Sequence, residues 1–244
     1  MRIPFLILMC GWLSISFGQQ FETYLVPGLG YRSVTLNKNL PDSYKDSLAN
    51  MDHLRQNWSG GVSYIHQFNE NSGLQIGLMY RRVSFKRKLE DIQFHDTVHP
   101  SIGRIEDLSQ SFQKDAHFTH LYQYLSIPVT YQQFLAPKYG RSKYSVYLTL
   151  GASADFLIDS QTDVFLRGFS VKGKSRYNLP ADYAGNGFNV SAMIGAKYTV
   201  KISEKAWFNL QPHLMYQVLN SASDNDLSLR LFQLNLQAGV AFEI

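Results

Sequence analysis

The last segment of the chain, RLFQLNLQAGVAFEI, alternates regularly between apolar and other residues. From Phe232 to Ile244 every second residue is apolar, and Gln233, Asn235, Gln237 and Glu243 lie between the apolar positions. Successive side chains of a β-strand point to opposite faces, so a period of two predicts a strand. This strand would have one apolar face and one polar face.

Seven earlier segments show the same kind of pattern: Phe21–Leu36, Trp58–Phe68, Leu74–Phe85, His120–Gln133, Tyr144–Leu157, Phe188–Val200 and Trp207–Leu219. Each spans at least about ten residues, which suits a tilted strand crossing a bilayer better than a soluble strand. Long connections (36–57, 86–118 and 158–187) alternate with shorter ones, as they do in outer-membrane barrels. The pattern predicts an all-β protein, an eight-stranded antiparallel up-and-down transmembrane β-barrel.

The alternative is a soluble eight-stranded barrel with its apolar face turned inward around a ligand. Its outer face would carry many Lys and Glu residues, whereas the second face here is mostly Gly, Ser, Thr, Asn and Gln, which suits a narrow packed lumen. Aromatic residues near the expected strand ends favour the membrane, because aromatic girdles mark both bilayer interfaces. They are Trp58, Tyr80, Phe85, Tyr131, Tyr144, Phe156, Tyr198, Trp207 and Phe242.

The N-terminal stretch adds a setting to this picture. Residues 1–18 combine Arg2, an apolar run and small residues before Gln19, which predicts a secretory signal peptide cut after Gly18. Residues 19–244 contain no linker-like break, so we expect one barrel domain there. The only cysteine, Cys10, lies in the predicted signal. The formal net charge of +4 is spread along the chain and gives no reason to expect a nucleic-acid partner.

The stretch HLYQYLSIPVTYQ, from His120 to Gln132, resembles a strand of the PorT-like outer-membrane β-barrel proteins of Bacteroidetes, with Ser126 where that family most often has Glu. VYLTLGASADFLI, NVSAMIGAKYTV and LQAGVAFEI follow in the family's order. The resemblance implies an eight-stranded barrel in a Gram-negative outer membrane. The founding member of that family assists protein export through the type IX secretion system. No catalytic residues define the family, so the resemblance implies none here.

Several charged residues fall on the inferred polar faces: Glu22, Arg32, Arg81, Asp155, Lys197, His213 and Glu243. An eight-stranded barrel is just wide enough inside for side chains to fill it, so these charges should meet and pair. One interpretation is a structural ion-pair network that plugs the lumen. The other is a gated, porin-like pore whose selectivity these residues set.

The sequence also contains candidates for a metal site and for a lipid A-modifying active site. His95 and His99 have a spacing that could place both near one metal ion with Asp96, although Pro100 and the loop-like context favour solvated histidines. Some small outer-membrane barrels modify lipid A with a Ser or His and an acid. His117, His120, Ser126 and Asp155 are the candidates here, but no spacing ties them together.

The sequence therefore favours a non-enzymatic structural or interaction protein of the outer membrane, an accessory to export or surface assembly. A small-solute channel and a lipid A-modifying enzyme remain the alternatives. We expect periplasmic termini, extracellular long loops and no cofactor or metal. Expected partners are outer-membrane lipid and lipopolysaccharide, the barrel assembly machinery during biogenesis, and a protein of a secretion system.

Overall fold

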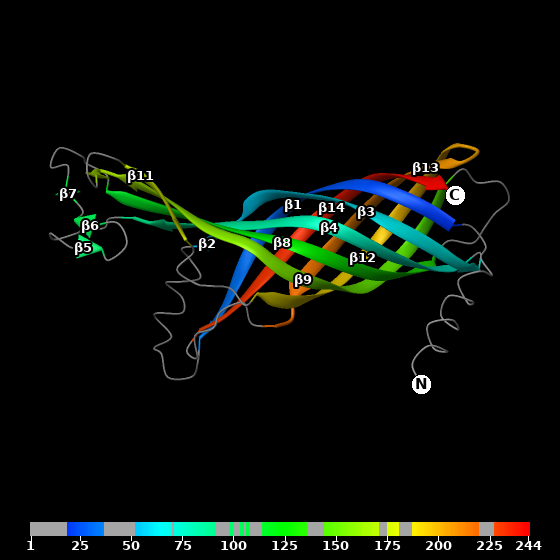
Figure 1. Ribbon diagram of the computed structural model, residues 1–244, viewed down its shortest axis with the longest axis horizontal. Coiled ribbons are helices and arrows are strands. Elements are labelled where there is room, and N and C mark those ends of the chain that lie inside the picture. The colour runs from blue at the N-terminus through cyan, green and yellow to red at the C-terminus, as the bar shows by residue number, and fades with distance from the viewer. Residues whose placement is uncertain are drawn as a thin grey trace, which may run out of the picture.

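The structure is a computed structural model that describes residues 19–36, 52–69, 71–90, 98–99, 103–104, 106–107, 114–135, 144–170, 175–180, 187–219 and 227–244. Eight antiparallel strands form a barrel: β1 (Gln19–Leu36), β3 (Arg55–Asn69), β4 (Ser72–Leu89), β8 (Asp115–Phe134), β9 (Tyr144–Arg167), β12 (Phe188–Ser203), β13 (Ala206–Gln217) and β14 (Leu227–Glu243). Because β14 pairs with both β13 and β1, the sheet closes on itself (Figure 1). The predicted fold class is confirmed.

The barrel has two distinct ends. Tight turns join β3 to β4 and β12 to β13 at the end that holds Gln19 and Ile244, where the Ile244 amide donates to the Gln19 carbonyl at 3.0 Å. We call this the terminus end, and the opposite end the sheet end. The predicted signal peptide, residues 1–18, lies outside the described residues.

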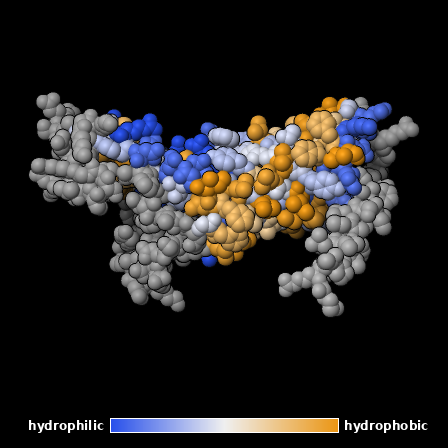
Figure 2. Space-filling model, in the orientation of Figure 1, coloured by the Kyte–Doolittle hydropathy of each residue, from blue (hydrophilic) through white to orange (hydrophobic). Residues whose placement is uncertain are grey.

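An apolar belt covers the outside of the barrel wall between these ends (Figure 2). Outward-facing Leu, Ile, Val and Phe side chains are exposed on every strand, among them Leu25, Val62, Leu78, Ile127, Leu150, Ile194, Leu214 and Leu236. An exposed apolar surface that surrounds a barrel is stable only against lipid, so the alternating faces belong to a membrane protein. Among the described residues, no helix is long and apolar enough to cross a membrane.

Aromatic side chains border the belt at both ends. At the sheet end Trp58 lies 5.9 Å from Tyr80, measured between ring centroids, and at the terminus end Tyr144 lies 6.1 Å from Tyr198. Phe85 departs from the sequence prediction, because it points inward and is buried. It occupies the next inward-facing position of β4 after Val83, and its ring stacks on His120 and Tyr122 instead of contacting lipid.

Several strands continue beyond the barrel at the sheet end, where β1 and β14 stay paired to Leu36 and Leu227 as a separate ribbon (Figure 1). β4, β8 and β9 stay paired to Leu89, Asp115 and Arg167, further than the sequence pattern predicted. β2 (Asp52–His53) and β11 (Arg176–Pro180) extend this sheet at its two edges, and β10 (Phe169–Ser170) pairs with β7 (Glu106–Asp107) beside it. A further short pair is formed by β5 (Val98–His99) and β6 (Gly103–Arg104). We call the β2–β4–β8–β9–β11 extension the projecting sheet; it runs to the left in Figure 1.

The projecting sheet has a hydrophobic core of its own. Ala116, Val164, Leu166 and Phe169 are buried together, and Leu89, Phe118 and Tyr177 pack against them. The alternation predicted from sequence stopped at Leu157 because beyond the belt the outward positions become polar. Pairing of the backbone nevertheless continues, so part of the expected 86–118 and 158–187 connections is regular sheet.

An irregularity in β9 separates its two parts. Tyr124 pairs with Leu157 and Gln123 with Asp159, so Ile158 has no counterpart on β8. One extra residue in a strand reverses which positions face inward beyond it. Odd-numbered residues such as Asp155 are buried before this bulge, and even-numbered ones such as Thr162 and Val164 after it.

Candidate functional site

The lumen is the first candidate site, because polar side chains from all eight strands are buried inside it. The alternation that leaves apolar residues outside also turns every second, polar residue inward. Residues with this placement include Ser63, Gln75, Thr130, Ser153, Ser191, Asn209, Gln211, Gln217, Gln233 and Asn235. Their side chains face one another across the barrel and not water, so each needs a partner inside.

Arg81 on β4 is the centre of one cluster. Its Nη1 donates to Asp155 Oδ2 on β9 at 2.6 Å and to Ser191 Oγ on β12 at 2.9 Å. Its Nε donates to Gln233 Oε1 on β14 at 2.6 Å. One guanidinium group, 1% exposed, therefore ties β4 to three other walls of the barrel.

Glu22 on β1 is the centre of a second cluster nearer the terminus end. Its carboxylate accepts from Gln75 Nε2 and Asn209 Nδ2, both at 2.8 Å, and from Ser63 Oγ at 3.2 Å. Lys197 Nζ lies 3.5 Å from Glu22 Oε2 and completes the set. Donors from four strands thus surround a carboxylate that has no exposed surface.

Apolar layers alternate with these polar clusters. Tyr24, Val26, Met79, Met193 and Met215 form a buried group, and Met79 lies between Gln75 of one cluster and Arg81 of the other along β4. Beyond Arg81, a further group contains Val83, Phe85, Tyr122, Tyr124 and Leu231. The lumen is therefore more apolar than the sequence pattern predicted, because Met and aromatic residues share the inward faces with the polar ones.

The other predicted lumen charges join neither cluster. Arg32 is buried, with its guanidinium carbon 4.5 Å from the centre of the Phe85 ring. His213 is buried too, within hydrogen-bonding distance of the Gln211 carbonyl (3.2 Å) and Asn235 (3.3 Å). Glu243 departs from the prediction, because it is the last residue of β14 and its side chain is exposed at the rim.

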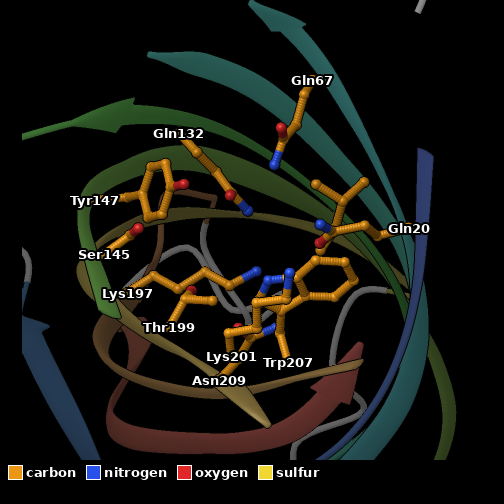
Figure 3. A pocket seen from close by; sticks show the side chains of 11 residues that line it. Gln20, Gln67, Gln132, Ser145, Tyr147, Lys197, Thr199, Lys201, Trp207 and Asn209 are labelled. Atoms are coloured by element: carbon orange, nitrogen blue, oxygen red, sulfur yellow. The ribbon is translucent and has the colours of Figure 1, made fainter. Parts of the chain in front are cut away.

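A small cavity of about 120 Å³ opens at the terminus end, below the Glu22 cluster. In Figure 3, side chains from several strands point into it, among them Gln132, Tyr147 and Lys197. Lys197, which contacts Glu22, lines this cavity. The cavity therefore extends from the rim to the Glu22 cluster. Lys201 and Trp207 also line it, and the Lys201 Nζ lies 6.0 Å from the Trp207 ring centre.

The residues considered for lipid chemistry do not come together. Ser126 is the register partner of Asp155, but the Asp155 carboxylate binds Arg81, Ser153 and Ser191, and Ser126 Oγ makes no hydrogen bond to the described residues. His120 lies six residues from Ser126 on β8, about 20 Å at the usual rise of a strand. Its Nδ1 lies 3.0 Å from Thr162 Oγ1 instead.

His120 is buried beyond the apolar belt, on the inner side of the projecting sheet. Burial, followed by the charges of Arg32 and Arg87, lowers the pKa of its imidazole to about 3. His117 is partly exposed on the outer side, with its ring centroid 5.9 Å from that of Phe165. His95 lies outside the described residues. Within the described ranges, no three His, Cys, Asp or Glu side chains group so as to hold a metal ion.

The neutral members of the two clusters were the residues that reasoning from charge missed. Gln75, Asn209 and Gln233 already stood on the polar faces of the alternation, so their burial could be predicted. Their role could not, because which strands face each other across the lumen depends on the closure of the barrel. The pairing of Arg81 with Asp155 and of Lys197 with Glu22 has the same origin.

Comparison with known proteins finds only distant structural similarity. No protein-family model matches the chain, and no curated protein matches it. Among solved structures, Ail of Yersinia pestis shares 13% identity over 91% of this chain and 99% of its own, with a TM-score of 0.33. Neisserial surface protein A shares 13% identity over 91% of this chain and 97% of its own, with a TM-score of 0.36. OprG of Pseudomonas aeruginosa shares 8% identity over 95% of this chain and 98% of its own, with a TM-score of 0.38. Likeness at this level says nothing of function.

Proposed function

We propose that this protein is an integral outer-membrane β-barrel with a closed lumen, which holds the projecting sheet outside the cell for contact with a protein partner. In this proposal it is a non-enzymatic interaction protein, an accessory to export or surface assembly like the PorT-like proteins that its sequence resembles. The observation that carries the proposal is the Arg81 cluster, which joins four walls of the barrel across the lumen.

The closed lumen argues against a solute channel. An open pore needs inward side chains that lie along the wall and leave a water-filled passage. Here Arg81 reaches across the lumen to Asp155 and Gln233, and the Glu22 cluster closes a second level. Opening either level would leave a charged group without its partners, which is costly in a dry interior.

The projecting sheet supports the interaction role. Its buried core, centred on Phe169 and Val164, makes it a folded platform and not a set of separate loops. The outer side carries Phe165, 42% exposed, next to His117. An exposed aromatic residue on a rigid sheet is a typical anchor for a protein contact.

Conductance in planar bilayers tests the closed lumen. We expect the folded wild-type barrel to give no steady conductance, and a heat-modifiable shift on gels will establish that the same sample is folded. Steady wild-type channels that Lys197→Ala abolishes or alters in selectivity would contradict the proposal and favour the porin-like alternative.

Site-specific crosslinking in native membranes tests the interaction role. A photoreactive residue at position 165 should capture one discrete protein, whereas the matched residue at position 205, at the terminus end, should not. Phe169→Ala, added to the variant with the photoreactive residue at position 165, should weaken this capture because it loosens the sheet. Equal labelling from both positions, or none, would argue against a partner on the sheet.

A lipid A profile that changes on deletion of the gene would instead favour the enzyme.

A further inference from the structure

A second pocket, of about 480 Å³, lies on the outer side of the wall at the sheet end. It is lined by Arg55, Arg82, Thr119, Leu121, Gln161, Asp163, Arg176, Tyr177 and Asn178. The bulge at Ile158 contributes to it, because it turns Gln161 and Asp163 outward while Thr162 is buried. Strands β4, β8, β9 and β11 thus present polar groups to the pocket, and Arg55 lines it from the start of β3.

The pocket holds more positive than negative charge. Its lining has three arginines and one carboxylate, Asp163, which accepts from Arg176 Nε at 3.1 Å and Nη2 at 2.5 Å. In the described part of the chain, no carboxylate is paired with the guanidinium of Arg55 or Arg82. Burial and then the charge of Arg82 lower the pKa of Arg55. The nearby Asp159 is occupied by Gln123 and Gln161.

The pocket lies directly beside the apolar belt. Arg82 is the next outward residue after Tyr80 of the sheet-end girdle on β4, and Gln123 on β8 follows the exposed Leu125 in the same way. On the face drawn in Figure 2, a hydrophilic zone adjoins the apolar belt on the side of the projecting sheet. A molecule in the pocket would therefore sit at headgroup depth, with apolar chains able to continue along the belt.

We propose that the Arg55–Arg82–Arg176 pocket binds the phosphate group of a membrane lipid headgroup. Guanidinium groups present planar pairs of donors that match phosphate oxygens and remain charged at all physiological pH values. Two arginines without a carboxylate partner, beside a third held in place by Asp163, offer the excess charge that such a group needs. The inference needs the barrel to be in a membrane, but it is independent of whether the lumen conducts and of any protein partner.

Native mass spectrometry of the full barrel in detergent tests the proposal, with bisphosphorylated lipid A as the probe. The double variant Arg55→Gln/Arg82→Gln should bind about tenfold more weakly, because it removes charge-assisted hydrogen bonds. The control Lys201→Gln/Lys205→Gln removes the same charge at the terminus end and should bind like the wild type. A heat-modifiable shift will establish that every variant is folded.

Two further probes separate the sources of the phosphate. Lipid A stripped of its phosphates should lose binding to the wild type, and millimolar inorganic phosphate should compete with the intact lipid. Binding of inorganic phosphate without binding of lipid A would retain a phosphate site but overturn the headgroup. Equal lipid binding by the double variant and the wild type, or by the stripped and intact lipid, would overturn the site itself.

Discussion

Strands β4, β8 and β9 run through both the barrel and the projecting sheet. Their apolar side chains point outward in the barrel and inward in the sheet. Within the belt, β8 and β9 turn apolar residues such as Ile127 and Leu150 outward and polar residues such as Thr130 and Ser153 inward. Beyond the belt, Ala116, Val164 and Leu166 are buried, and most outer positions are polar, with the exposed Phe165 as an exception. The difference shows that the medium beside each face decides its chemistry, because β8 and β9 remain paired with each other on both sides of the bulge at Ile158.

The comparison also predicts where stability resides. The barrel depends on buried polar clusters that join opposite walls, whereas the sheet depends on a small apolar core. Substitutions in the first should therefore destabilise the whole molecule, and substitutions in the second only the extension.

The largest effect is expected for Arg81→Ala. It leaves Asp155 buried without its cation, so the free energy of unfolding should fall by about 3–5 kcal/mol. Urea titration of the barrel in lipid vesicles, followed by the heat-modifiable shift, measures this change. Lys205→Ala, at an exposed position in the turn between β12 and β13, is the control and should change it by about 0.5 kcal/mol or less. Similar losses for both variants would mean that the lumen cluster does not support the fold.

Phe169→Ala should destabilise the projecting sheet alone. Its side chain is fully buried in the apolar core, and removal of a buried Phe ring costs about 3–5 kcal/mol where the site cannot collapse. We expect faster proteolysis and hydrogen exchange in residues 115–119 and 162–167, with the unfolding of the barrel unchanged. A lower unfolding midpoint of the whole barrel would show that the two regions fold as one unit.

Acidification should open the inner side of the projecting sheet through His120. Its folded pKa of about 3 is below the unfolded value, so between these pH values the unfolded sheet takes up a proton that the folded sheet does not. Stability should fall by about 2 kcal/mol from pH 7 to pH 5. Hydrogen exchange around Thr162 measures this fall, and His120→Gln should remove the slope. A slope that survives this substitution would assign the pH dependence to another group.

The smallest effect is expected for Asp163→Asn. This breaks the ion pair with Arg176, but the Arg176 side chain is 73% exposed. Exposed ion pairs contribute about 0–1 kcal/mol and are screened by salt. Thermal unfolding of the sheet, at low salt and at high salt, should shift only slightly. A loss as large as that of Phe169→Ala would show that the outer polar face, and not the apolar core, holds the sheet.

The sequence by itself determined the strands of the barrel and the direction of their faces. The apolar residues from Phe232 to Ile244 and from Tyr144 to Phe156 recur at every second position, a period that only a strand satisfies. The polar residues between them therefore had to point into a narrow lumen. This part was predictable because it depends on side-chain spacing along the chain, which needs no knowledge of neighbouring strands.

Only the tertiary structure decided which of those polar residues meet, and where the alternation changes its meaning. Arg81 and Asp155 are far apart in the chain and are joined by closure of the barrel, as are Glu22 and Lys197. In β9 apolar residues such as Leu150 and Phe156 hold even positions before the bulge at Ile158, and Val164 and Leu166 hold even positions after it. The first two face the lipid and the last two face the sheet core. One residue without a partner reverses a face, and a period of two alone does not reveal such a residue.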